Sequence, residues 1–184
     1  MRLLSFDIGI CNLAYAYADY NTETKRLEIV DWSLLPLKQT KEKKDFGEIT
    51  SELVRVINEK FWDLHIDVVL IENQPVMKNP VMKTLQIMIY TIFMLKKQQK
   101  SLATDIKLVS AQSKLKIKEK DKIDVSHIVT VDKYRRNKQL AIAYTKYYLT
   151  YTNQSEEWQT FFDKSSKKDD ISDTALYIFN YLGL

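Results

Sequence analysis

The sequence has 184 residues, of which 45% are hydrophobic and 11% aromatic, so it predicts a single folded domain over residues 1–184 and excludes general disorder. Three glycines and three prolines are too few for an architecture built on glycine-rich phosphate loops or proline linkers. The formal net charge of +4 is unevenly distributed, because residues 96–138 carry thirteen basic and five acidic side chains. Such a basic block is typical of a polyanion-binding surface or of a solvated lysine-rich loop.

The first half of the chain predicts mainly strands. Alternating and β-branched patterns indicate three consecutive strands over residues 2–8, 13–20 and 26–32. Apolar residues at helical spacing then predict a helix over 46–61. The segment DVVLI at 67–71, apolar after its first residue, is typical of a strand buried on both faces.

The second half predicts mainly helices. A long helix with a wide apolar face is expected over 80–97, a strand over 105–109, and helices over 133–149 and 169–182. Residues 112–132 have the weakest pattern and are expected to be exposed and irregular. The order predicts an α/β fold, a mixed five-stranded sheet with a three-strand antiparallel meander, two parallel strands and helices on both faces.

Sorting and redox signals point to the inside of the cell. Cys11 is the only cysteine and cannot form an internal disulfide, and the sequence opens on a strand pattern rather than a charged-then-apolar leader. No apolar stretch reaches the ~18 residues that a membrane span needs. We therefore expect an intracellular protein without a transmembrane helix.

Acidic residues stand at the ends of two apolar strands and at the start of the last helix. Asp7 and Glu72 each close an apolar run, and they would meet if the first and fourth strands are neighbours. Asp170 and Asp173 are one helical turn apart and share a face. Converging carboxylates repel each other unless a cation neutralises them, and Mg²⁺ prefers such ligands. The pattern therefore predicts a metal-dependent nuclease of the two-ion type.

Each acid has a simpler explanation when taken alone. An Asp at the end of a strand is usually a turn former, and acids in the first turn of a helix favour its dipole. Asp169 in particular fits a helix-capping role. Only the joint placement of the acids favours a functional site.

Three short motifs carry a family resemblance. The segments FDIGICN at 6–12, LIENQP at 70–75 and KDDISDTAL at 168–176 resemble, in order, the acidic motifs of RuvC-type Holliday junction resolvases, with the second and third most like those of poxvirus and mitochondrial resolvases. The resemblance implies a ribonuclease-H-like fold, a homodimer, and paired nicking of four-way DNA in recombination or repair. It also implies Mg²⁺ as cofactor, replaceable by Mn²⁺, with two ions at each site.

The resemblance assigns roles position by position. It implies that the metal ligands and catalytic acids are Asp7, Glu72, Asp170 and Asp173. Asp170 is preferred over Asp169 because the family spacing is Asp-x-x-Asp. The family also has a basic residue that assists at the scissile phosphate. Here Arg135, Arg136, Asn137 and Lys138 crowd the matching region, with Asn137 at the lysine position in a simple alignment, and Lys138 is chosen over the two arginines.

The basic block supplies the expected DNA contacts. We expect alternate lysines on an extended segment to point the same way toward phosphates, together with two arginines near the start of the next helix. These predicted DNA-binding residues are Lys114, Lys116, Lys118, Lys120, Lys122, Arg135 and Arg136.

Partner, location and alternative functions stay open at this stage. The apolar face of helix 80–97, with Met88 and Ile92, is expected to form core, a dimer interface, or both. A poxvirus-like protein would act at cytoplasmic viral replication sites, and an organellar one in mitochondria. The alternative functions are a ribonuclease-H-like enzyme that cuts RNA/DNA hybrids and a non-catalytic DNA-binding module. A sugar-kinase-like phosphotransferase is disfavoured because residues 10–12 supply no phosphate turn.

Overall fold

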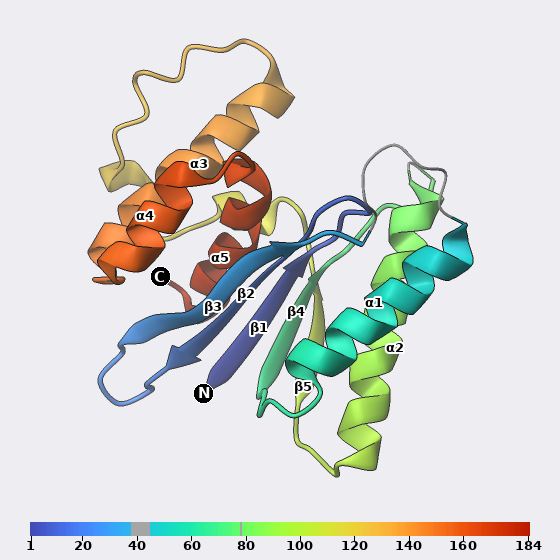
Figure 1. Ribbon diagram of the computed structural model, residues 1–184. Coiled ribbons are helices and arrows are strands. Elements are labelled where there is room, and N and C mark those ends of the chain that lie inside the picture. The colour runs from blue at the N-terminus through green and yellow to red at the C-terminus, as the bar shows by residue number, and fades with distance from the viewer. Residues whose placement is uncertain (38–44, 78) are drawn as a thin grey trace.

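The computed structural model describes residues 1–37, 45–77 and 79–184. One five-stranded sheet lies between two layers of helices (Figure 1). The strands are β1 (Arg2–Asp7), β2 (Leu13–Tyr20), β3 (Leu27–Leu35), β4 (Val68–Glu72) and β5 (Asp105–Val109). The helices are α1 (Phe46–Phe61), α2 (Pro80–Gln99), α3 (Lys133–Tyr151), α4 (Glu156–Lys164) and α5 (Lys168–Leu182), with the short 3-10 helices η1 (Ser113–Leu115) and η2 (Lys120–Lys122).

The sheet is mixed and has the strand order β3-β2-β1-β4-β5. The first three strands pair antiparallel, whereas β4 runs parallel to both β1 and β5. Phe6 lies opposite Ile71, so β1 and β4 end side by side. This arrangement confirms the predicted mixed sheet with its meander and two parallel strands.

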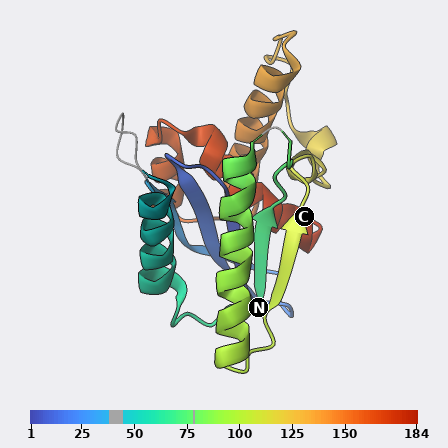
Figure 2. The same ribbon diagram turned by 90° about the vertical axis from the view of Figure 1, so that its right-hand side faces the viewer.

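Alternation along the strands creates two cores. Leu4 and Phe6 of β1 belong to the cluster under α1 and α2, whereas Leu3 belongs to the cluster under α3, α4 and α5. Figure 2 shows α1 and α2 together on one face of the sheet. Both faces of β1 and β4 are therefore buried, which explains why these strands read as continuous apolar runs.

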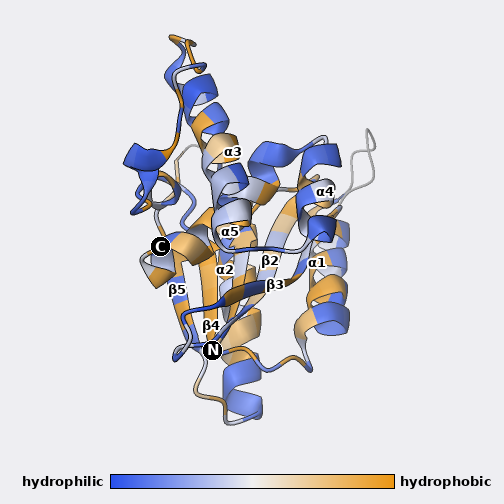
Figure 3. Cartoon of the chain, turned by 90° about the vertical axis from the view of Figure 1, so that its left-hand side faces the viewer, coloured by the Kyte–Doolittle hydropathy of each residue, from blue (hydrophilic) through white to orange (hydrophobic). Residues whose placement is uncertain are grey.

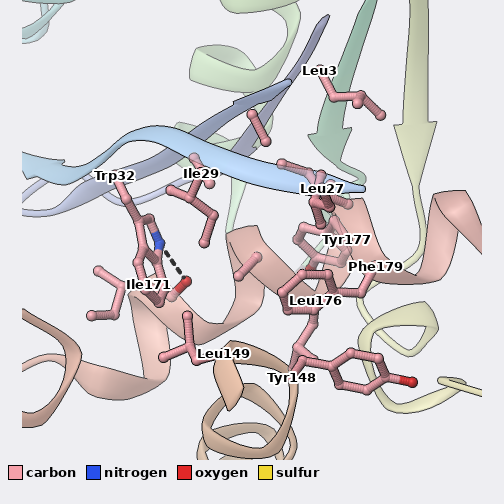
Figure 4. Packing of buried hydrophobic residues seen from close by; sticks show 14 of the residues in the cluster. Leu3, Leu27, Ile29, Trp32, Tyr148, Leu149, Ile171, Leu176, Tyr177 and Phe179 are labelled. Atoms are coloured by element: carbon pink, nitrogen blue, oxygen red, sulfur yellow. Dashed lines mark hydrogen bonds between the residues drawn. The ribbon is translucent and has the colours of Figure 1, made fainter. Parts of the chain in front are cut away.

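Trp32 fixes α5 against the sheet. Its indole is buried and donates to the carbonyl of Ile171 at 3.0 Å (Figure 4). The indole also donates to the hydroxyl of Thr174 at 3.1 Å. The hydroxyl of Ser5 in β1 donates to the carbonyl of Thr174 at 2.7 Å. Burial of these polar groups is compensated by hydrogen bonds, so α5 has one defined position on the strands.

The predicted elements agree with the structure within a few residues, with three exceptions. Helix α4 was not predicted, although Ser155 caps it and two glutamates follow in its first turn. The segment after β5 contains η1 and η2, so the prediction of an extended lysine segment was wrong. The predicted cap by Asp169 was also wrong, because Lys167 occupies the N-cap of α5 without a side-chain bond. No helix in the described part of the chain has both the length and the apolar character needed to cross a membrane.

Candidate active site

Carboxylates from three elements meet at one end of the sheet. Asp7 is the last residue of β1 and Glu72 the last of β4, and the parallel pairing of these strands brings both residues to the same end. Helix α5 adds its first-turn acids and Asp173. Together they line a pocket of about 440 Å³. The acids that line this pocket, here called the acidic pocket, are Asp7, Glu72, Asp169, Asp170 and Asp173.

Gly9 lets the chain turn directly after Asp7. A Cβ atom at this position would lie 2.3 Å from the backbone oxygen of Asn12, a distance that no side chain tolerates. Only glycine fits without a shift of the backbone. The turn therefore keeps the end of β1, and with it the carboxylate of Asp7, in place.

Three carboxyl groups of the acidic pocket have raised pKa values. Burial, followed by the hydrogen bond and charge of Glu72, raises the pKa of Asp7 well above its usual range. Burial also raises the pKa of Asp173 to about 7, with further contributions from Glu72 and Asp170. The pKa of Asp170 is raised by burial and then by the charge of Asp169. The group repels its own negative charge, as expected for carboxylates that serve a cation.

Lys114 lies inside the acidic pocket. Its ammonium group forms an ion pair with the carboxylate of Asp173, and its side chain is largely buried. The charges of Asp173, Glu72 and Asp7 outweigh the effect of burial and raise its pKa. Sequence reasoning grouped Lys114 with the DNA-contacting lysines, but the structure places it among the acids because η1 turns the chain toward α5.

Lys138 reaches the same pocket from α3. Its Nζ donates to Asp169 Oδ2 at 2.5 Å and lies 4.8 Å from the ring centre of Tyr134. Burial alone would raise the pKa of Asp169, but the hydrogen bond and charge of Lys138 outweigh it and lower that pKa. Asp169 is therefore paired, whereas Asp170 has no ion pair within the described residues. The side chains of Tyr134, Lys138, Asp169 and Asp170 line the pocket together with that of Asn137.

Tyr177 is a component of the site that sequence reasoning missed. It is buried one helical turn after Asp173, and burial followed by the charges of Glu72 and Asp173 raises the pKa of its hydroxyl well above the usual value. The signal was present in the spacing, since positions four apart on a helix share a face. A tyrosine one turn beyond Asp173 was overlooked because it also fits an ordinary core.

The remaining predicted DNA-binding residues lie outside the pocket. Lys116, Lys118 and Lys120 are exposed on the segment that follows η1, and Lys122 pairs with Glu119 at 2.5 Å. Arg135 and Arg136 are exposed in the first turn of α3, and neither forms an ion pair with a described residue. The structure thus separates one buried lysine from an outer set of cations.

The acidic pocket fits a hard divalent cation. Over the described ranges, no group of three or more His, Cys, Asp or Glu side chains already stands in a metal-binding arrangement. Lys114 instead supplies positive charge beside Asp173. The potential ligands are nonetheless carboxylates, whose oxygens are the ligands that Mg²⁺ prefers. Burial, and after it the charges of neighbouring acids, raises the pKa of Asp7 and of Asp173, and a bound cation would favour their ionised forms.

Comparison with known sequences identifies a viral relative. No protein-family model matches the chain. An uncharacterised protein of Acanthamoeba polyphaga mimivirus is 31% identical over 178 residues, which cover 91% of this chain and 42% of that protein. The chain therefore spans less than half the length of this curated relative.

Several solved structures with the same architecture are Holliday junction resolvases. The yeast mitochondrial resolvase Ydc2 superposes with a TM-score of 0.66 at 21% identity, over 98% of this chain and 78% of Ydc2. The fowlpox virus resolvase gives 0.67 at 16% identity, over 99% and 98% of the two chains. RuvC of T. thermophilus, solved with a Holliday junction substrate, gives 0.60 at 10% identity, over 98% and 94%. The chain has the RuvC-like, ribonuclease-H-like fold that the motifs implied.

Proposed function

We propose that this chain is a structure-selective DNA endonuclease that resolves four-way junctions by paired, Mg²⁺-dependent nicks. The observation that carries the proposal is the convergence of Asp7, Glu72, Asp170 and Asp173 in one pocket on a fold shared with junction resolvases. Exposed cations near this pocket complement the phosphate backbone of DNA. Such an enzyme acts inside the cell on intermediates of recombination or repair.

The acids and Lys138 have different roles in this proposal. The four carboxylates are the proposed ligands of two Mg²⁺ ions, for which Mn²⁺ can substitute. When bound, the metal would supply an activated water and charge stabilisation at the leaving oxygen. Lys138, held by Asp169, would face the scissile phosphate and stabilise its developing charge.

Lys114 has a different proposed role from the outer lysines. Its ammonium group stands beside Asp173, where it offsets the mutual repulsion of the acids. A divalent ion bound by the same carboxylates would take over this neutralising role. Lys114 would then be free to approach the phosphate, so its proposed role is in the cleavage step rather than in DNA affinity.

Two nicks in one junction require two active sites, which a two-fold dimer supplies. Helix α2 presents a stripe of exposed residues that includes Ile87 and Leu95. Met88 and Ile92 are only partly exposed, because they pack against the core cluster under this helix. We therefore place the proposed homodimer interface on the Ile87 and Leu95 side of α2.

The deciding experiment compares cleavage of a four-way junction, an RNA/DNA hybrid duplex and a linear DNA duplex, each with Mg²⁺ and with EDTA. Asp7→Asn is the inactive reference. Asp63→Asn is the matched control, because Asp63 is highly exposed, pairs with Lys100, and precedes the start of β4 at the opposite end of the sheet. The proposal expects paired, symmetric nicks in the junction by the wild type and by Asp63→Asn only.

The other outcomes identify the competing functions. Cleavage confined to the RNA strand of the hybrid would replace the proposal with a ribonuclease activity, since the same acids would serve both reactions. Junction binding with no cleavage in Mg²⁺ or Mn²⁺ would indicate a non-catalytic DNA-binding module.

A further inference from the structure

The start of α3 and the residues just before it project from the body of the protein and carry exposed apolar side chains. Residues 128–136, here called the α3 tip, extend beyond the other elements (Figures 2 and 3). Val129 is 85% exposed and Val131 is 99% exposed, the highest value among the large hydrophobic residues of the described chain. Exposed apolar side chains at the end of a projection mark a contact surface, because water solvates them poorly.

Three cations follow these valines along the chain. Lys133, Arg135 and Arg136 occupy the first turn of α3, which contains no acidic residue. The positive end of the helix dipole disfavours basic residues at this place. None of the three forms an ion pair within the described part of the chain. The carboxylate of Asp132 caps this helix and offsets part of their charge, but the three cations are exposed and favour a polyanionic partner.

The α3 tip adjoins the acidic pocket. Tyr134, which is 69% exposed, lies between the valines and Lys138, and both Tyr134 and Lys138 line that pocket. The ring of Tyr134 also lies against the ammonium group of Lys138. A DNA strand whose phosphate enters the pocket would thus have its neighbouring nucleotides within reach of the α3 tip.

We infer that the α3 tip is a branch-point wedge. Val129 and Val131 lie against the base pairs exposed at the centre of a four-way junction, while Lys133, Arg135 and Arg136 hold the flanking phosphates. Apolar side chains that insert at base steps unstack and bend DNA, and a branch point offers base faces that a continuous duplex does not. This inference rests on the proposed function, because it names how the same site selects branched DNA.

The test uses a four-way junction with 2-aminopurine at a base beside the branch point, in EDTA so that no cleavage occurs. Saturating wild-type protein should raise the fluorescence of the probe, because its base is unstacked. The double variant Val129→Ser, Val131→Ser should lose most of this rise while its salt-dependent affinity for linear duplex stays at the wild-type value. Val54→Ser is the matched control, since Val54 is an exposed valine on α1, and it should behave as wild type.

The outcomes separate the inference from the proposed function. If the double variant raises the fluorescence as much as the wild type, or if the wild type raises none, the wedge is wrong. Wild-type protein that cuts junctions in Mg²⁺ would keep the proposed function intact in both cases. Failure of the wild type to bind or cut a junction at all would overturn the proposed function and the wedge together.

Discussion

The carboxylate of Asp173 has its pKa raised to about 7 by burial and by the charges of Glu72 and Asp170, despite the ion pair with Lys114. A carboxyl group whose pKa is higher in the folded than in the unfolded state stabilises the fold at low pH. This contribution is lost as the pH rises through the folded pKa. We predict that the difference in Tm between metal-free Asp173→Asn and wild type becomes more positive between about pH 5 and pH 8.

Calorimetry in EDTA at several pH values measures this difference. Mg²⁺ should stabilise the wild type and reduce the difference at pH 8, because the ion favours the ionised carboxylates. A difference that does not change with pH would show that Asp173 ionises in the folded protein without cost.

Cleavage should depend on each proposed ligand separately. Asp7→Asn, Glu72→Gln, Asp170→Asn and Asp173→Asn should each lower the single-turnover rate with Mg²⁺ by roughly 1,000-fold or more, because each removes a metal ligand. Junction affinity in EDTA should persist, since the outer cations hold the phosphates. Asp169→Asn should have a milder effect, because Asp169 acts through Lys138. Wild-type cleavage by any of the four variants would remove that residue from the site.

At the scale of elements, the side chains of Gln154 and Trp158 bond backbone groups at the edge of the sheet formed by β3. Gln154 accepts a hydrogen bond from the backbone of Ile29 and donates one to the carbonyl of Leu27, each at 2.8 Å. The amide thus replaces part of a neighbouring strand, and the indole of Trp158 donates to the carbonyl of Ile29. Edge strands that keep unpaired backbone groups invite aggregation.

We predict that Gln154→Ala destabilises the protein by about 2 kcal/mol, because it leaves two backbone groups of β3 without partners. Urea denaturation followed by circular dichroism measures the loss. Gln98→Ala is the control, since Gln98 is exposed near the end of α2. Equal stability of the two variants would mean that water replaces the amide at this edge.

The proposed interface on α2 makes a second prediction for an element. Ile87→Lys or Leu95→Lys should convert the dimer into a folded monomer, since either places a charge in an apolar contact. Sedimentation at several protein concentrations measures the mass, and junction assays should then show single rather than paired nicks. Val54→Lys on α1 should remain dimeric. A wild-type monomer that makes paired nicks would contradict the dimer.

Most helices and strands could be predicted from the sequence because their buried residues recur at regular intervals. Strands such as β4 are apolar up to their last residue, and α1 buries one face at helical spacing. Helix α4 was not predicted because its nine residues are too few to show a clear helical period. The roles of Lys114 and Gln154 could not be predicted, because each depends on a partner far along the chain, Asp173 and the β3 backbone respectively. Long-range contacts of single polar residues leave no local pattern.

At the scale of the whole molecule, the basic block divides into an inner and an outer part. Replacing Lys116, Lys118 and Lys120 together by Gln should flatten the slope of log affinity against log salt by about 0.9 for each phosphate that is no longer neutralised. Lys114→Gln should leave this slope unchanged and lower the cleavage rate, because Lys114 lies in the acidic pocket. Binding titrations at several salt concentrations distinguish the two variants. A large slope change for Lys114→Gln would return that lysine to the DNA-contacting set.

The burial of α5 affects how readily different parts of the site open. Nine consecutive residues, from Ile171 to Phe179, are buried. Their backbone amides should exchange hydrogen for deuterium only through global unfolding, whereas those of the exposed segment before α3 should exchange through local opening. The acids on α5 are therefore held in place before DNA arrives. We therefore expect any adjustment to a branched substrate to fall on the exposed segment that carries the outer cations.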